Sequence, residues 1–144
     1  MKRTLSYFST VFHKSFAAYT SKRLQQTGLN YGSLFLVIYV GKHPNCTPAE
    51  MTNALHMDWG HSQRSITKLV QDGFLRKEKS ENDHRSYHLT LTEKGQLAFD
   101  TSHQVFFDWD AETLSCLSED EREQLLFLLE KLTQKKEEGH SFVQ

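Results

Sequence analysis

The sequence has little cysteine, little net charge and no long apolar run. Its two cysteines, Cys46 and Cys116, lie far apart in the chain, so their spacing does not indicate a disulfide framework. The longest apolar run, residues 34–40, is too short to cross a bilayer, and the N-terminal residues form no apolar signal core. We therefore expect a soluble cytoplasmic protein without a membrane partner.

Sequence motifs of the common enzyme classes are also missing. The chain has no phosphate-binding glycine loop, no nucleophile elbow and no paired-carboxylate motif. Its 144 residues suit one domain with one core, and no repeat, low-complexity tract or Pro/Gly-rich linker divides them. We expect a single domain over residues 1–144 that is not an enzyme and needs no cofactor.

The charged residues are unevenly distributed along the chain. Basic side chains gather in its central part, at Arg64, Lys68, Arg76, Lys77, Lys79 and Arg85. Acidic side chains gather toward the C-terminal end, at Glu119, Asp120, Glu121, Glu123, Glu130, Glu137 and Glu138. A nucleic-acid-binding surface needs only a local basic face, so the formal net charge of −1 does not exclude one.

Residues 47–73 carry the boundary signals of two short helices joined by a tight turn. Thr47 and Glu50 have the spacing of a capping box, in which each side chain accepts a hydrogen bond from the backbone amide of the other. Asp58 is placed to cap the second helix, and Gly73 is a typical helix stop. This pattern predicts a helix-turn-helix.

The second of these helices is predicted to have two different faces. Its inner face comprises residues at helical spacing, Ser62, Ile66, Leu69 and Val70. Its outer face, with Trp59 near the helix start and Gln63 at the border, comprises Gly60, His61, Arg64, Thr67, Lys68 and Gln71. Arginine and glutamine can each form paired hydrogen bonds to a base edge, whereas lysine suits phosphate. Taken alone, these residue types favour an ordinary solvated helix face over a DNA-contacting one.

A charged hairpin is predicted directly after the helix-turn-helix. Residues 74–79 and 86–91 are extended runs separated by a polar loop of turn-forming residues. At such a tip Arg85 is suited to a narrow minor groove, and Asp83 is placed to hold its guanidinium by two hydrogen bonds. A helix-turn-helix followed by a charged hairpin is typical of a winged-helix DNA-binding region, which we assign to residues 30–92.

Three segments carry a more specific pattern: Gly73-Phe74-Leu75-Arg76-Lys77, Asn82-Asp83-His84-Arg85-Ser86 and Leu89-Thr90-Leu91-Thr92-Glu93-Lys94-Gly95. With them the chain resembles the multiple-antibiotic-resistance regulator (MarR) family of bacterial transcription factors over nearly its whole length. The resemblance implies an obligate homodimer on a pseudo-palindromic operator in double-stranded DNA, usually a repressor and often released by a small acidic or aromatic ligand. It implies wing roles for Asp83 and Arg85, and DNA-facing positions at Trp59, Gly60, His61, Gln63, Arg64 and Lys68.

The segments outside the winged region, residues 1–29 and 93–144, are expected to be dimerisation helices. The first carries an aromatic stripe that needs a covering partner, comprising Leu5, Phe8, Phe12, Phe16 and Tyr19. The last is expected to open at Ser118 and to pack its leucines on two surfaces, one of them in the other subunit. The fold class is therefore mainly α with a small β-hairpin wing, a winged helix-turn-helix flanked by N- and C-terminal dimerisation helices.

A ligand pocket is expected between the terminal helices and the winged region. Its candidate lining is mostly aromatic, comprising Phe12, His13, Phe16, Tyr31, Phe35, Tyr39, Phe106 and Trp109. The alternative is a packed aromatic core that holds no ligand. The remaining alternative function is a winged-helix protein-interaction module that does not bind DNA, which would lack the salt-dependent DNA affinity that phosphate neutralisation produces.

Histidine and cysteine do not indicate a metal or redox site. His84 and His88 are four residues apart, but on a predicted loop and strand this spacing does not bring imidazoles to one side. No metal is expected, although zinc ligands from distant segments stay open, and His61 and His84 are candidate phosphate or base contacts. Redox sensing of the kind known in peroxide-responding relatives needs a thiol near the first helix, and neither cysteine lies there.

Overall fold

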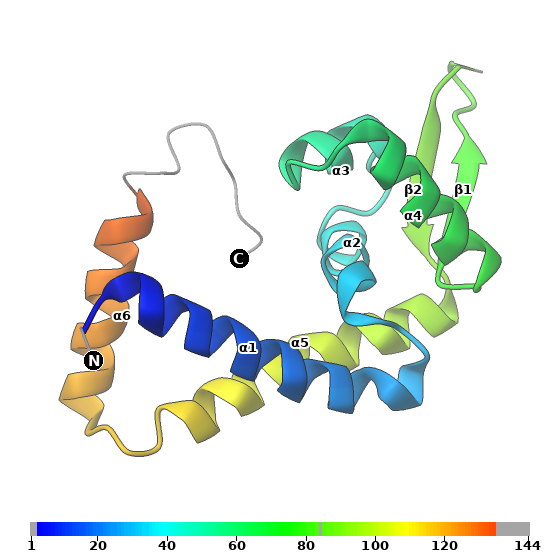
Figure 1. Cartoon of the computed structure of the whole chain (residues 1–144). Helices are drawn as coiled ribbons and strands as arrows, with labels where there is room; N and C mark the ends of the chain where they lie inside the picture. Colours follow the sequence, from blue (N-terminus) through cyan, green and yellow to red (C-terminus); the bar gives the residue numbers. More distant parts are fainter. Residues whose placement is uncertain (1–2, 84, 135–144) are drawn as a thin grey trace.

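Helices and one antiparallel hairpin make up the described part of the chain, residues 3–83 and 85–134 of a computed structural model (Figure 1). In chain order the elements are α1 (Leu5–Leu24), a 3-10 turn (Gln25–Thr27), α2 (Tyr31–Lys42), α3 (Pro48–Ala54), α4 (Trp59–Gln71), β1 (Leu75–Lys79), β2 (Tyr87–Leu91), α5 (Glu93–Thr113) and α6 (Glu119–Gln134). The expected fold class, mainly α with a small hairpin, is confirmed. None of the described helices is both long enough and apolar enough to span a membrane.

The helix boundaries follow from local capping signals. The Thr47 hydroxyl accepts from the Glu50 amide at 3.1 Å while the Glu50 carboxylate accepts from the Thr47 amide at 3.0 Å, which is the predicted capping box. Ser118 and Glu121 form the same reciprocal pair before α6. Gly73 ends the α4 segment with φ +83°, a left-handed conformation that glycine adopts without strain. These starts and stops lie within a residue or two of the predicted ones.

The hydrophobic core is built around α2. Leu34 and residues 36–40 of this helix are buried, as expected for an apolar run in the middle of the protomer. Phe74, at the entrance to the hairpin, is almost completely buried, and Leu89 of β2 is fully buried. The core therefore joins α2 to both halves of the winged module.

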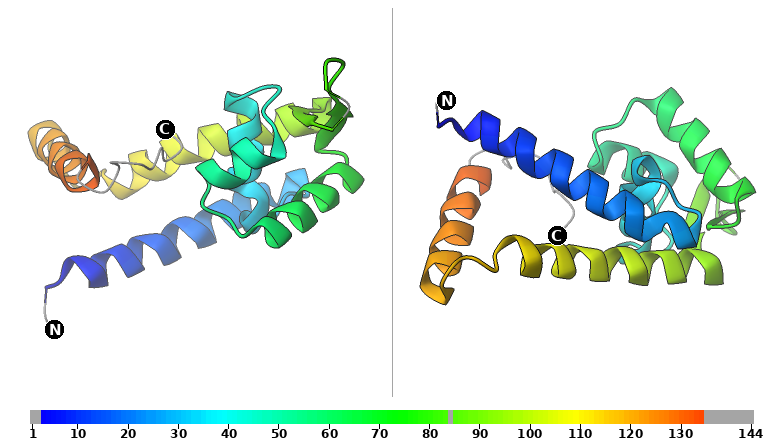
Figure 2. Two further views of the ribbon diagram at one scale, coloured as in Figure 1. Left: turned by 90° about the horizontal axis from the view of Figure 1, so that it is seen from above. Right: turned by 60° about the horizontal axis from the view of Figure 1, so that its bottom comes forward.

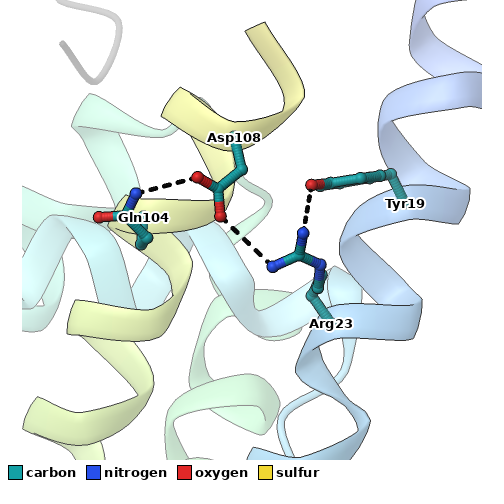
Figure 3. Close-up of polar contacts among 4 residues, drawn as sticks. All are labelled: Tyr19, Arg23, Gln104 and Asp108. Carbon is teal, nitrogen blue, oxygen red and sulfur yellow. Dashed lines mark hydrogen bonds and ion pairs between the residues drawn. The ribbon is translucent and has the colours of Figure 1, made fainter. Parts of the chain in front are cut away.

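Helices α1 and α5 converge beneath the winged module and spread apart toward the end where α6 lies (Figure 2). The side chain of Arg23, in α1, connects the two helices. One of its guanidinium nitrogens donates to the carboxylate of Asp108 in α5 at 3.3 Å, and another donates to the hydroxyl of Tyr19 in α1 at 2.6 Å (Figure 3). The other Asp108 oxygen accepts from the Gln104 amide at 3.0 Å. These partly exposed contacts connect α1 to α5.

The apolar side of α5 differs from the prediction. The sequence after Thr92 predicts a long helix whose main apolar positions are Leu97, Val105, Phe106 and Trp109. Val105 is buried, but Leu97 is 64% exposed. The small residues Ala98 and Ser102 face the core in its place. Small side chains at these positions let α5 lie close to α2. Which residues of α5 face the core therefore depends on the neighbouring helix and not on the hydrophobicity of α5 itself.

A close backbone contact joins α5 to the hairpin. A Cβ at Gly95 would overlap the carbonyl oxygen of Phe74 and lie 3.0 Å from its carbonyl carbon. The Thr92 hydroxyl caps α5 by accepting from the Gly95 amide at 3.0 Å, and it donates to the carbonyl oxygen of Gly73. The first turn of α5 is thereby fixed directly to the segment that enters β1.

Apolar side chains at the ends of the chain lack a covering surface. Exposed side chains in α1 include Leu5, Tyr7, Phe8, Val11 and Phe12. The exposed large apolar side chains of α6 are Leu126, Phe127, Leu128, Leu129 and Leu132, and no residue of this helix is buried. The described protomer therefore leaves the apolar sides of both terminal helices in solvent.

Candidate nucleic-acid interface

Two buried hydroxyls hold α3 and α4 in a fixed relation. The oxygens of Thr52 and Ser62 are 2.6 Å apart, and both side chains are buried. Because the Thr52 hydroxyl donates to the Pro48 carbonyl at 2.6 Å, the Ser62 hydroxyl is the donor between the two helices. Sequence reasoning missed this pair, since hydroxyls on helices commonly contact only their own backbone. The contact orients α4 on α3.

The outward face of α4 is basic and solvent-exposed. Its exposed polar side chains are Arg64, Thr67, Lys68 and Gln71. The Lys68 ammonium lies 3.2 Å from the Asp72 carboxylate, but both side chains are largely exposed, so this pair stabilises little and Lys68 can exchange it for a phosphate. A Cβ at Gly60 would lie 3.2 Å from a guanidinium nitrogen of Arg64, so glycine leaves room for that side chain.

One inner position of α4 was predicted wrongly. Ser62, Ile66 and Leu69 are buried as expected, but Val70 is 36% exposed. Val70 follows Leu69 by 100° around the helix, which places it beyond the buried stripe. Val70 therefore adds an exposed apolar side chain at the border of the outward face of α4.

Three more predicted DNA-facing residues lie at the edges of this face. Trp59, the first residue of α4, is 55% exposed, a large apolar surface for an aromatic side chain. Gln63 is half-buried, and its amide nitrogen is enclosed without a hydrogen-bond partner in the described protein. A donor enclosed in this way costs free energy unless another molecule supplies an acceptor. His61 is exposed on the opposite edge.

An isolated β-bridge joins the hairpin to the segment before α3. Leu89 of β2 exchanges backbone hydrogen bonds with the segment before α3, donating to the Cys46 carbonyl at 2.8 Å and accepting from the Asn45 amide at 3.0 Å. The His88 ring nitrogen Nδ1 lies 2.9 Å from the Asn45 carbonyl oxygen. A bridge of one residue pair has no alternating sequence pattern, so sequence reasoning did not identify this contact.

The wing tip uses Asp83 in a different way from the prediction. The Asp83 carboxylate accepts from the backbone amide of Arg85 at 3.0 Å, and no ion pair joins their side chains within residues 3–83 and 85–134. A carboxylate two residues before an amide satisfies it locally, a turn contact that competes with the predicted guanidinium pair. Arg85 itself is exposed. His84, also predicted to face DNA, lies outside the described residues.

These basic elements share one end of the molecule. Figure 1 shows α4 and the hairpin next to each other, with α6 at the opposite end. Exposed basic residues of β1, Arg76, Lys77 and Lys79, add to those of α4, and the Lys77 ammonium stands 4.6 Å from the centre of the Tyr87 ring. A helix with a basic face next to a basic hairpin offers a duplex both base-contacting and phosphate-contacting groups.

The aromatic side chains predicted to line a ligand pocket mostly pack on one another. Phe16 contacts the rings of Tyr31, Phe106 and Trp109, with ring centres 5.3 to 6.2 Å apart. Phe12 contacts Trp109, and Tyr31 contacts both His13 and Phe35. Burial raises the pKa of the Tyr31 hydroxyl. Seven of the eight predicted residues thus form one cluster.

The eighth residue, Tyr39, lies apart from this cluster. Its ring stacks on His43 with the two ring centres 4.2 Å apart. A separate cavity of about 520 Å³ lies between α2 and the α3–α4 turn, and Phe35 is the one residue of the predicted lining that borders it. A ligand role for the aromatic cluster stays a prediction. Within the described residues, no three His, Cys, Asp or Glu side chains are grouped so that they could hold a metal ion.

The two cysteines differ in exposure. Cys46 is buried, and burial together with the nearby charge of Glu50 raises the pKa of its thiol to about 11. A thiol that stays protonated at neutral pH is a poor nucleophile. Cys116 is exposed in the connection between α5 and α6.

Comparison with known proteins identifies the family to which this chain belongs. The family model of SarA/Rot transcriptional regulators matches residues 18–101. The HTH-type transcriptional regulator BilQ of Clostridium symbiosum is 42% identical over 137 residues, which cover 95% of each chain. A MarR crystal structure superposes with a TM-score of 0.81 at 20% identity, covering 94% of each chain. A mutant MarR of Escherichia coli in complex with operator DNA superposes with a TM-score of 0.76 at 22% identity, covering 89% of this chain and 92% of that one.

These likenesses agree with the resemblance drawn from the hairpin motif, and the family they identify is one of regulators and not of enzymes. The chain belongs to the SarA/Rot transcriptional regulators and has the winged-helix fold of MarR proteins.

Proposed function

We propose that this protein is a homodimeric repressor that binds a pseudo-palindromic operator and is released by a small ligand. The observation that carries the proposal is the exposed basic face of α4 beside the basic hairpin, both at one end of the molecule. In this arrangement α4 enters a major groove with Arg64 and Lys68, and Arg85 of the wing meets the adjacent minor groove. A dimer bound in this way represses by covering DNA that the transcription machinery needs.

The exposed apolar sides of α1 and α6 support the dimer. Ten large apolar side chains of these two helices are exposed, and a second copy of the chain can cover them symmetrically. Two α4 helices related by a two-fold axis fit successive major grooves when they lie about 34–36 Å apart. The crossing of α1 and α5 then sets this separation, so a ligand that changes the crossing changes DNA affinity.

Selection of bound duplexes from a random pool with the purified protein tests the proposal. We expect an inverted repeat whose half-sites are centred about 10 base pairs apart, and an affinity that falls steeply with salt as phosphate contacts are lost. Enrichment of a single unrepeated half-site would contradict the symmetric dimer. Failure to enrich any duplex, with no salt-dependent DNA affinity, would favour the protein-interaction module.

Replacing Arg64 by alanine is expected to weaken binding to the selected operator by roughly 1–3 kcal/mol, as loss of a paired contact to a base does. The affinity for random duplex should change much less, because most nonspecific affinity comes from phosphate contacts. Fluorescence anisotropy at fixed salt measures both affinities. Lys68→Ala is the matched control on the same face, expected to weaken both duplexes alike. Equal losses for Arg64→Ala on operator and random DNA would make Arg64 a phosphate contact.

A further inference from the structure

The side chain of Lys94, in the first turn of α5, lies across the segment that leaves α4. Its ammonium nitrogen donates to the backbone carbonyl of Asp72 at 2.8 Å and stands 4.4 Å from the centre of the Phe74 ring. A Cβ built on Gly73 would lie 3.9 Å from the Lys94 Cδ, so the side-chain stem passes beside that glycine. One side chain of α5 thus contacts three consecutive residues after α4.

The contact with Asp72 satisfies a carbonyl at the C-terminal end of α4. The last carbonyl groups of a helix have no partner within it and need one from outside. The Leu69 carbonyl accepts from the Phe74 amide at 2.9 Å, so a nearby backbone amide serves it. The carbonyl of Asp72, the residue that ends α4, accepts instead from the Lys94 ammonium, whose charge also suits the negative end of the helix dipole. A different helix therefore supplies this cap.

We propose that Lys94 is a positioning residue for DNA binding, which holds the C-terminal end of α4 to α5 and so fixes the orientation of the outward face of α4. The inference rests on the proposed function, because the outward face carries the proposed DNA contacts. On that face Lys68 lies about one turn before Asp72, and Arg64 lies about two turns before it. Contacts to base edges specify sequence and depend on how the helix lies in the groove. Lys94 therefore contributes to operator preference without touching DNA.

Two lysines hold Asp72 at different atoms. The Lys68 ammonium lies 3.2 Å from the Asp72 carboxylate, whereas the Lys94 ammonium contacts the Asp72 carbonyl. In the proposed function Lys68 leaves that carboxylate for a DNA phosphate. The contact with Lys94 uses the backbone of Asp72 and does not compete with DNA, so it persists when Lys68 has moved. The end of α4 is then still joined to α5 in the complex.

The alternative role for Lys94 is a direct phosphate contact, since its side chain is exposed. Salt dependence separates the two roles. Loss of a phosphate contact weakens binding to all duplexes alike and reduces the slope of log affinity against log salt by about one. Loss of a positioning contact leaves that slope unchanged and weakens operator binding most, because the freed helix end must be ordered again when it meets the bases.

Lys94→Met tests the proposal, because methionine keeps an unbranched stem beside Phe74 but has no donor. We expect operator affinity to fall about fivefold, the effect of one charge and its hydrogen bond at a helix end, with random-duplex affinity and salt slope nearly unchanged. Lys94→Arg should restore most of the operator affinity, since arginine can donate to the carbonyl and stack on the ring. Lys22→Met, which removes one charge from the exposed surface of α1, is the matched control and should bind as the parent does.

Fluorescence anisotropy over a range of salt concentrations, on full-length proteins that urea unfolding shows to be folded, measures these affinities. Equal losses on operator and random duplex, with a shallower salt slope, would make Lys94 a phosphate contact and overturn the proposal. Lower stability of Lys94→Met with an unchanged operator preference would make Lys94 a structural residue only, which also overturns it. An arginine variant that binds as weakly as Lys94→Met would argue equally against the contact with the carbonyl.

Amide hydrogen exchange without DNA tests the contact between α4 and α5 independently of the proposed function. The amides of Asp72, Gly73 and Phe74 all donate to carbonyls of α4 in the turn that Lys94 covers. We expect them to exchange about fivefold faster in Lys94→Met and at the parent rate in Lys94→Arg. Unchanged exchange in Lys94→Met would overturn the proposal. Faster exchange in a protein whose parent form binds no duplex would instead refute the DNA-binding function and leave the contact between the helices supported.

Discussion

Replacing Leu128 and Leu132 together by aspartate is expected to convert the proposed dimer into monomers and to lower operator affinity about 10²–10⁴-fold, the gain that linking two binding modules provides. Both side chains are exposed in α6, where no residue is buried within the described protomer. Burying four carboxylates at a two-fold interface has a large desolvation cost that no partner charge offsets. Sedimentation velocity measures the state of assembly, and anisotropy measures DNA affinity.

A matched variant, Gln124→Asp, changes an exposed polar residue of the same helix. It should leave both the assembly and the DNA affinity as they are in the parent protein. The double aspartate variant should keep its helical circular dichroism, because α6 contributes no buried residue to the core. A double variant that still sediments as a dimer would show that α6 is not at the interface.

Replacing Gly95 by alanine is expected to lower the free energy of unfolding by about 3 kcal/mol, the upper part of the usual range for overpacking. The added Cβ would overlap the Phe74 carbonyl oxygen, a backbone atom that no side-chain rotation can move away. Alanine is intrinsically better than glycine inside a helix, so any destabilisation measured here understates the steric cost. At 2–4 °C per kcal/mol, the melting temperature should fall by about 6 to 12 °C.

Gly32→Ala is the control for this substitution, since it also replaces a helical glycine but meets only the Asn30 side-chain oxygen, at 3.4 Å. It is expected to be neutral or to stabilise by up to about 1 kcal/mol. Both variants are compared in urea at one protein concentration, because the stability of a dimer depends on concentration. Equal stability of Gly95→Ala and the parent would mean that α5 can shift away from Phe74 at no cost.

The sequence predicted the helix boundaries well because caps are local. Thr47 and Glu50, or Ser118 and Glu121, find their partners three residues away whatever the rest of the chain does. The wrong predictions concern contacts that depend on other elements. Leu97 has the hydrophobicity of a core residue, yet Ala98 is the residue that faces the core.

The sequence predicted which residues lie at the candidate interface better than it predicted which atoms those residues contact. Arg64 and Lys68 lie on the exposed face of α4 as expected, since helical periodicity alone determines which residues share a side. The partner of Asp83 was predicted wrongly because a carboxylate near a turn has two competing donors, and the adjacent amide is reached with less loss of side-chain freedom. The cavity beside Asp58 is formed by two segments whose spacing no sequence pattern specifies.

The contact between Gly95 and Phe74 has a mechanical consequence for operator choice. Because the base of the hairpin is fixed to the first turn of α5, the wing tilts with that helix as one rigid body. The 21 residues of α5 span about 31 Å at about 1.5 Å per residue. A tilt of α5 by about 10° about its C-terminal end would therefore displace the wing by about 5 Å, more than the rise of about 3.4 Å per base pair. In the proposed dimer, small changes of angle between the protomers would thus suffice to move Arg85 from one base step to the next.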